Sequence, residues 1–153
     1  MFSDLIRPII NNAQQVAFGS FLFQIPGTWA EFIIDGEETR RILPYQDPET
    51  GEMITIRGPR GAAGHPFSFN DLGQLVFEGT RRPFEEYRGG LFFFDGENFS
   101  TIAFADDLVP DPRGIVYGDF FRMKLNSVGD VAFEAGWYPR GERGLFLASP
   151  DSP

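Results

Sequence analysis

Asn70-Asp-Leu-Gly73-Gln-Leu-Val76-Phe77 is the stretch that decides the fold, because the chain contains the same pattern three times. A second copy, Asn126-Ser-Val-Gly129-Asp-Val-Ala132-Phe133, shares the pattern N-x-x-G-x-[LV]-[AV]-F. The third, Asn11-Asn-Ala-Gln14-Gln-Val-Ala17-Phe18, has Gln14 in place of the glycine. The asparagines lie 59 residues apart from 11 to 70 and 56 apart from 70 to 126. A period of about 57 residues indicates one supersecondary unit that is repeated.

Each unit has the pattern of successive β-hairpins. In the second unit, alternating apolar residues precede Asn70, and Asn and Gly are residues that accept the left-handed backbone of a tight turn. A second hairpin signal, Asp95-Gly96, separates two further apolar runs. The pattern predicts strands at 66–69, 74–78, 90–94 and 99–104 in this unit, at 6–10, 16–23, 31–34 and 39–43 in the first, and at 120–125, 130–138 and 144–148 in the third.

Four antiparallel strands repeated in this way are typical of β-propeller blades. We therefore predict an all-β, β-propeller-like fold in which residues 1–153 form a single repeat domain. Its repeats are 1–58, 59–115 and 116–153, and the third blade is incomplete because it lacks its fourth strand. The competing fold is a β-sandwich or a roll of stacked meanders, which would not require the motif to return so regularly.

The apolar residues repeat in register with the motif, which predicts a core between the sheets. One strand face carries the residues one and three before each asparagine. The chain has 18 Phe, which is better explained by packing than by a ligand cage. The expected core residues are Ile10, Phe69 and Leu125, Pro8, Phe67 and Met123, the motif residues Phe18, Phe77 and Phe133, and the third-strand residues Phe32, Phe92 and Phe146.

Composition excludes several classes of function. A net charge of −9 disfavours sequence-independent nucleic-acid binding, so Arg40-Arg41 and Arg81-Arg82 are expected on solvated strand faces or in ion pairs. No apolar run approaches the roughly 18 residues of a membrane span, and residues 1–30 show no signal peptide. Without cysteine, and with His65 as the one histidine, a thiolate or histidine-based metal site is excluded. We assign His65 a structural position near a strand start.

Acidic residues leave one enzymatic alternative. A two-carboxylate glycoside hydrolase could draw on acidic residues of the exit loops, but their recurrence with the repeat favours a structural role in turns. The same oxygens could bind calcium, although Asp35-Gly-Glu-Glu38 and Asp95-Gly-Glu-Asn98 lack the calcium-loop spacing. We predict no enzymatic activity, no metal and no cofactor. The acidic candidates are Asp47, Glu49, Asp106, Asp107 and Asp111.

The motif resembles that of tandem-repeat bacterial surface proteins that carry N-x-x-G-x-x-[AV]-F, often ahead of a choice of C-terminal anchors. Gly90-Leu-Phe-Phe-Phe-Asp95-Gly96 is a second landmark of the likeness, which extends over essentially the whole chain. The departures are Gln14 and the Ala148-Ser149-Pro150 sequence where a final Asp-Gly is expected. The resemblance implies an extracellular or cell-surface protein with a propeller-like fold.

Three blades cannot close a ring, so we expect an open array whose end faces invite association. The predicted function is a non-catalytic structural or binding module that self-associates as a closed ring or a filament. Alternatives are a fragment whose missing blades complete the ring, and a glycan-binding or glycoside-hydrolase-like propeller that uses its acidic loops. A glycan or surface-protein ligand would be expected at the non-repeating loops, where Tyr87, Arg88 and Tyr138 are the candidate binding residues.

Overall fold

The computed structural model describes residues 2–22, 29–48, 51–56, 67–82, 88–110, 115–138 and 141–149. The described chain is built of β-strands in three antiparallel sheets, which confirms the all-β class. The first sheet consists of β1 (Phe2–Ile10), β2 (Val16–Leu22), β3 (Trp29–Asp35) and β4 (Glu38–Leu43). The second consists of β5 (Tyr45–Gln46), β6 (Met53–Ile56), β7 (Phe67–Phe69), β8 (Leu75–Arg82), β9 (Arg88–Phe94) and β10 (Phe99–Phe104). The third consists of β11 (Val116–Leu125), β12 (Val131–Tyr138) and β13 (Arg143–Ala148).

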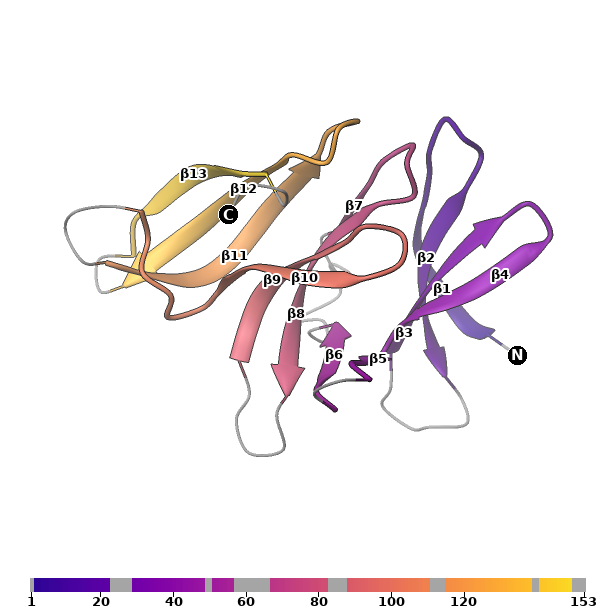
Figure 1. The fold of residues 1–153 in the computed structure, drawn as a ribbon, viewed down its shortest axis with the longest axis horizontal. Helices are drawn as coiled ribbons and strands as arrows, with labels where there is room; N and C mark the ends of the chain where they lie inside the picture. Colours follow the sequence, from indigo (N-terminus) through magenta and orange to yellow (C-terminus); the bar gives the residue numbers. More distant parts are fainter. Residues whose placement is uncertain are drawn as a thin grey trace.

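The three sheets follow one another along the molecule and fan out from their motif turns. In Figure 1 the β1–β2, β7–β8 and β11–β12 turns lie close together along the upper edge, while the opposite ends of the sheets spread apart. The strand orders are β1-β2-β3-β4 in the first sheet, β10-β9-β8 in the main part of the second and β11-β12-β13 in the third, so the strand that follows each motif turn has a neighbour on both sides. The hairpins therefore place every motif turn at the same end of its sheet.

The second sheet differs from the others in its first strand. β1 and β11 pair along the whole of β2 and β12. In the second sheet, β7 pairs with Leu75–Phe77 of β8, whereas β6 pairs with its continuation, Gly79–Arg82. Two short strands thus share the place of one long strand. β5 and β6 come from residues assigned to the first repeat, so the first repeat extends into the second sheet by strand pairing.

A pair of stacked phenylalanine rings recurs at the centre of each sheet. The motif phenylalanine lies directly opposite the third-strand phenylalanine in all three registers. The ring centroids are 5.3 Å apart for Phe18 and Phe32, 5.7 Å for Phe77 and Phe92, and 5.4 Å for Phe133 and Phe146. Such offset stacking adds to the free energy from area burial, so each pair holds two neighbouring strands together.

The apolar core lies at the two junctions between sheets. At the first junction, Ala17 and Ile33 of the first sheet share a cluster with Phe77 and Phe92 of the second. At the second junction, Val76, Leu91 and Phe93 of the second sheet share a cluster with Phe133 of the third. The second and third sheets therefore turn their phenylalanine pairs toward the preceding sheet, and the first and second sheets turn their opposite faces toward the following sheet.

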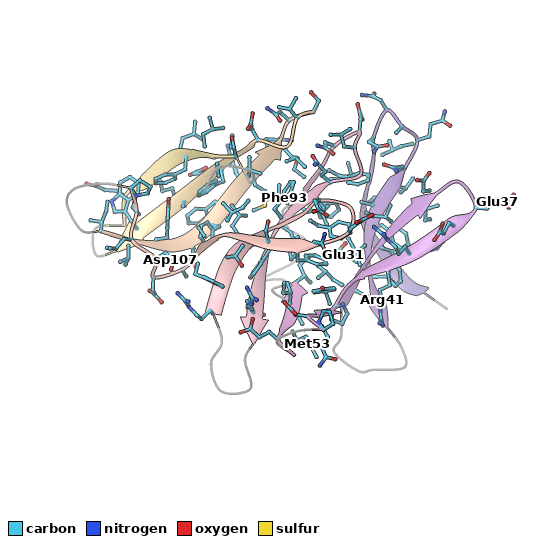
Figure 2. All side chains as sticks on the ribbon, viewed as in Figure 1. Glu31, Glu37, Arg41, Met53, Phe93 and Asp107 are labelled. Atoms are coloured by element: carbon cyan, nitrogen blue, oxygen red, sulfur yellow. The ribbon has the colours of Figure 1, made fainter. Side chains whose placement is uncertain are left out.

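A buried carboxyl group interrupts the apolar pattern at the first junction. Glu31 on β3 lies opposite Gly19 on β2, and Figure 2 shows it between the first and second sheets. The side chain fits because a Cβ on Gly19 would lie 2.7 Å from Glu31 Oε1. Glu31 is 3% exposed, and this burial raises its pKa to about 8. The equivalent residue of the second sheet is Leu91, which has no group to titrate.

Removing the charge of Glu31 should flatten the pH dependence of stability. Its pKa is about 8 in the folded chain against 4.5 for the free side chain, so the folded state holds the extra proton between these values. Glu31 therefore favours folding at low pH and loses this contribution as pH rises. The free energy of unfolding of Glu31→Gln, relative to that of wild type, should rise by about 1.4 kcal/mol per pH unit across this window. Urea denaturation at several pH values measures it, and a pH-independent difference would contradict the assignment.

Gln14 is the second residue whose conformation departs from the repeat. Its φ of 65° lies in the left-handed region, as do the φ of 75° at Gly73 and the φ of 98° at Gly129. Unlike the glycines, Gln14 carries a Cβ. In Gln14→Gly this strain is relieved, so we expect a gain of roughly 1 kcal/mol in the free energy of unfolding. The reverse change, Gly73→Gln, should lower stability, and chemical denaturation of dilute protein measures both. A loss of stability in Gln14→Gly would show that its side chain makes a favourable contact.

Candidate functional site

Each motif asparagine organises its own turn. The Oδ1 atom of Asn70 accepts hydrogen bonds from the backbone N–H groups of Leu72 and Gln74, each at 3.0 Å. Its Nδ2 atom donates to Oε1 of Gln74 at 2.7 Å. Asn126 makes the same contacts with Val128 and Asp130. These side-chain-to-backbone bonds hold the tight turn that the left-handed glycine makes possible.

The same asparagines also bond to one another across the sheets. Nδ2 of Asn11 donates to the backbone carbonyl of Asn70 at 2.8 Å, and Nδ2 of Asn70 donates to that of Asn126 at 2.8 Å. We name this series of bonds through Asn11, Asn70 and Asn126 the asparagine ladder. It has a direction, because the earlier repeat always supplies the donor and the later repeat the acceptor. An amide side chain with two N–H groups can satisfy its own turn and the next repeat together.

A second layer of polar contacts runs beside the ladder. At the first junction, the backbone N–H and Nδ2 of Asn12 donate to the two carboxylate oxygens of Asp71 at 2.7 and 2.8 Å. These hydrogen bonds, the side-chain bond foremost, lower the pKa of Asp71. At the second junction, the hydroxyl of Ser68 accepts the backbone N–H of Leu125 at 3.1 Å. The edge of the molecule that carries the motif turns is thus a continuous polar seam.

A groove of about 240 Å³ opens beside the seam between the first two sheets. Three of its polar side chains have partners within the chain. Arg40 donates to the carbonyl of Gly96 at 2.6 Å and lies over the ring of Phe94, and these contacts join the first sheet to the second. Within the first sheet, Nε2 of Gln15 donates to Asp35 at 2.9 Å. The groove is lined by Gln15, Ile33, Asp35, Glu38, Arg40, Leu72, Gly73 and Gly96.

The candidate binding residues lie at the ends of strands remote from the motif turns. Arg88 begins β9, where it is exposed, lies 4.2 Å from the ring centroid of Phe104 and pairs with Asp107 at 3.1 Å. Tyr138 ends β12, opposite Val116 in the third sheet. Tyr87 and His65 lie outside the described residues. Arg88 and Tyr138 therefore belong to different sheets, and their shared site stays a prediction.

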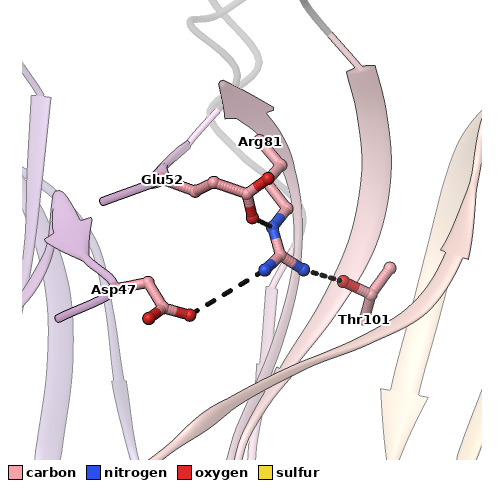
Figure 3. Close-up of polar contacts among 4 residues, drawn as sticks. All are labelled: Asp47, Glu52, Arg81 and Thr101. Atoms are coloured by element: carbon pink, nitrogen blue, oxygen red, sulfur yellow. Dashed lines mark hydrogen bonds and ion pairs between the residues drawn. The ribbon is translucent and has the colours of Figure 1, made fainter. Parts of the chain in front are cut away.

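Two of the acidic candidates have arginine partners. Arg81, on β8, is held between the carboxylates of Asp47 and Glu52 and the hydroxyl of Thr101 (Figure 3), which makes it an ion-pair partner as predicted. Asp107 is paired with Arg88 and accepts the backbone N–H of Phe104. Asp106 has a φ of 75° in the same turn, and Glu49 and Asp111 lie outside the described residues. Within the described ranges, no group of three acidic or histidine side chains could hold a metal ion.

The outer face of the third sheet exposes two large leucines. Leu145 and Leu147 on β13 are 80% and 75% exposed. They lie opposite Glu134 and Ala132 on β12, on the face directed away from the second sheet. Their equivalents in the second sheet, Leu91 and Phe93, are buried at the junction with the third sheet. The open face therefore has the composition of a junction, and no sheet of the described residues packs on it.

No protein-family model, curated protein or solved structure matches this chain. In the described part of the chain there is also no helix with the length and apolarity that a membrane crossing requires. The candidate site therefore stands on its own geometry, which is the asparagine ladder together with the open face of β13.

The motif pattern predicts the asparagines as turn residues, but it does not predict their bonds between repeats. One signal was available in the first copy, where the glycine is replaced by Gln14 and the asparagine is kept. A residue needed only for turn formation would be expected to vary as the glycine does. Retention of Asn11 without the glycine indicates a further partner, which the structure identifies as the carbonyl of Asn70.

Because of the ladder, Asn70 should contribute more to the free energy of unfolding than Asn126. Asn70→Ala removes the turn bonds and the bond to the third repeat from a site that is 6% exposed. Asn126→Ala removes comparable turn bonds from an exposed site with no following repeat in the described chain. We expect losses of roughly 2–4 kcal/mol and about 1 kcal/mol respectively. Urea denaturation of dilute protein measures both, and equal losses would show that the inter-repeat bond contributes nothing.

Proposed function

We propose that the chain is a non-catalytic structural and binding module that self-associates through its two end sheets. The observation that carries this proposal is the exposure of Leu145 and Leu147, whose equivalents at the internal junction are buried. Exposed apolar side chains that continue a repeating core are typical of an interface. Adding a further sheet there would bury the same kind of surface that joins the three sheets already present.

The fan of sheets supports a propeller-like assembly as part of this proposal. Each ladder bond spans 2.8 Å at the motif edge, where the turns approach one another closely. Away from this edge, packed sheets are usually about 10 Å apart, because side chains fill the space between them. Sheets that are hydrogen-bonded at one edge and separated by side chains beyond it must therefore diverge from that edge, as the blades of a propeller do. Continued rotation by further copies would close a ring or propagate a filament, according to the rotation at each junction.

The acidic loops support a structural role better than a catalytic one. Asp47 and Asp107 each form an ion pair with an arginine, Arg81 and Arg88 respectively, which is an arrangement typical of structural contacts in turns rather than of a facing acid and base. A glycan or a surface protein as ligand belongs to the same proposal, as does a location outside the cell or at its surface, on the strength of the motif's likeness to bacterial surface repeats.

Light scattering of the purified chain tests the proposed self-association. Wild type should have a mass greater than one chain, and Leu145→Glu with Leu147→Glu should reduce it to one chain, because each leucine would be replaced by a charge that opposes burial. Both positions are exposed, so the variant should keep its fold.

A charge-matched control is Leu108→Glu with Met53→Glu, at two exposed positions outside the third sheet. This control should retain the mass of wild type. A single-chain mass for wild type at all concentrations would remove the proposal, and dissociation of the control as well would show that added charge alone is responsible.

A further inference from the structure

The ladder leaves a donor at one end of the chain and an acceptor at the other. Asn11 and Asn70 each use both N–H groups of their amides, one in their own turn and one on the next repeat. Asn126 donates to Asp130 within its turn, and in the described chain no later repeat supplies a carbonyl for its second N–H. The carbonyl of Asn11 occupies the position that accepts the ladder bond in Asn70 and Asn126. The two ends of the ladder are therefore chemically complementary.

A second complementarity lies beside the ladder. Within the chain, Gln15 lies over Gly73 and Gln74 lies over Gly129, and a Cβ on either glycine would be 3.4 Å from the glutamine Oε1. A long side chain thus faces a residue without a Cβ at both junctions. The corresponding residues at the chain ends are Asp130, which is one methylene shorter than glutamine, and Gln14, which carries a Cβ. If these two ends met, the shorter side chain of Asp130 would face the larger Gln14, and the space between repeats would be the same as at the internal junctions.

The exposed apolar residues of the two end sheets match in the same sense, with those of the first sheet on its first strand and its central pair, Phe18 and Phe32, already buried. Leu145 and Leu147 are exposed where Leu91 and Phe93 are buried against the third sheet. On the opposite end, Ile10 is 68% exposed, although its equivalents Phe69 and Leu125 pack into the two junction clusters. Pro8, on the same face as Ile10, is likewise exposed, and its equivalents Phe67 and Met123 pack at the junctions.

We propose that copies of this chain join head to tail, with the third sheet of one copy packed on the first sheet of the next. Nδ2 of Asn126 donates to the carbonyl of Asn11 in the next copy, and Leu145 and Leu147 cover the face that carries Ile10. The proposal rests on the proposed self-association and adds its direction and residues. Pairing of like ends would oppose donor to donor at Asn126, with no carbonyl to accept either. The second copy is thus recognised by continuation of the internal junction.

Single-cysteine variants test the direction of the contact, since the chain has no cysteine of its own. Asn12 and Asp71 occupy the same motif position in successive repeats and touch one another through two hydrogen bonds. Ser127 occupies this position in the third repeat. Head-to-tail contact places Ser127 of one copy beside Asn12 of the next, and both residues are exposed, so Asn12→Cys and Ser127→Cys should fold.

The two variants, one carrying a size tag, are mixed and oxidised, and the disulfide-linked species are separated by size. We expect the mixed Asn12→Cys with Ser127→Cys product to exceed either like pair severalfold. Ser100→Cys mixed with Ser127→Cys is the matched control for random collision, because Ser100 is exposed on β10 of the central sheet. A single chain that carries both substitutions should give a linked ring or a series of multimers.

The outcomes separate the direction of the contact from self-association itself. An excess of the Ser127→Cys like pair, with an oligomeric mass by light scattering, would overturn the head-to-tail arrangement while self-association stands. Oligomeric mass with cross-linking no greater than the Ser100→Cys control would place the contact on another surface and overturn the arrangement as well. A single-chain mass together with control-level cross-linking would overturn the proposed function and this inference together.

Discussion

The hydrogen bond from one motif asparagine to the backbone of the next is the constraint on which the arrangement of the sheets depends. Packing of apolar faces alone leaves two sheets free to slide, because hydrophobic burial has no direction. The Asn11–Asn70 and Asn70–Asn126 bonds fix one point on each sheet and align the equivalent turns of all three. The apolar clusters then supply most of the stabilisation around a register that the polar seam has already set. A short bond at one edge and large rings within the sheets together require the fan seen in Figure 1.

The residues beside the ladder show how a repeat is adapted to its position in a series. Gly73 and Gly129 must be left-handed and must also leave room for the glutamine of the preceding repeat. Gln14 meets the first requirement at a cost in strain, because it carries a Cβ in the left-handed region. The first repeat therefore keeps the same turn with a larger residue, at the position that would face Asp130 of another copy in the head-to-tail arrangement that we propose.

Sequence periodicity predicted those parts of the fold that repeat, and it failed where a contact depends on residues distant in the chain. The Asp95-Gly96 hairpin and the stacked pairs such as Phe77 with Phe92 follow from local turn chemistry and alternation. Pairing of β6 with the far end of β8 could not be predicted, because it joins residues of the first repeat to the second, and local alternation does not specify such a partner. The ladder was missed for a similar reason: an asparagine that fits its own turn does not identify a partner 56 or 59 residues away, and the one sign of such a partner was the retention of Asn11 beside Gln14.

The two junctions are alike in shape and unlike in chemistry, and this difference follows from one exchange of residues. The second and third sheets carry a glutamate on the second strand, Glu78 or Glu134, opposite a leucine on the third. In the first sheet, the glutamate is on the third strand, as Glu31, opposite Gly19. The exchange moves a carboxyl group from a partly exposed site into the apolar first junction, where ionisation opposes packing. The first sheet is therefore attached by a junction that weakens as pH rises, whereas the second junction has Leu91 at this position and lacks that response. A stack of nearly identical units thus has one junction whose packing responds to pH at this position.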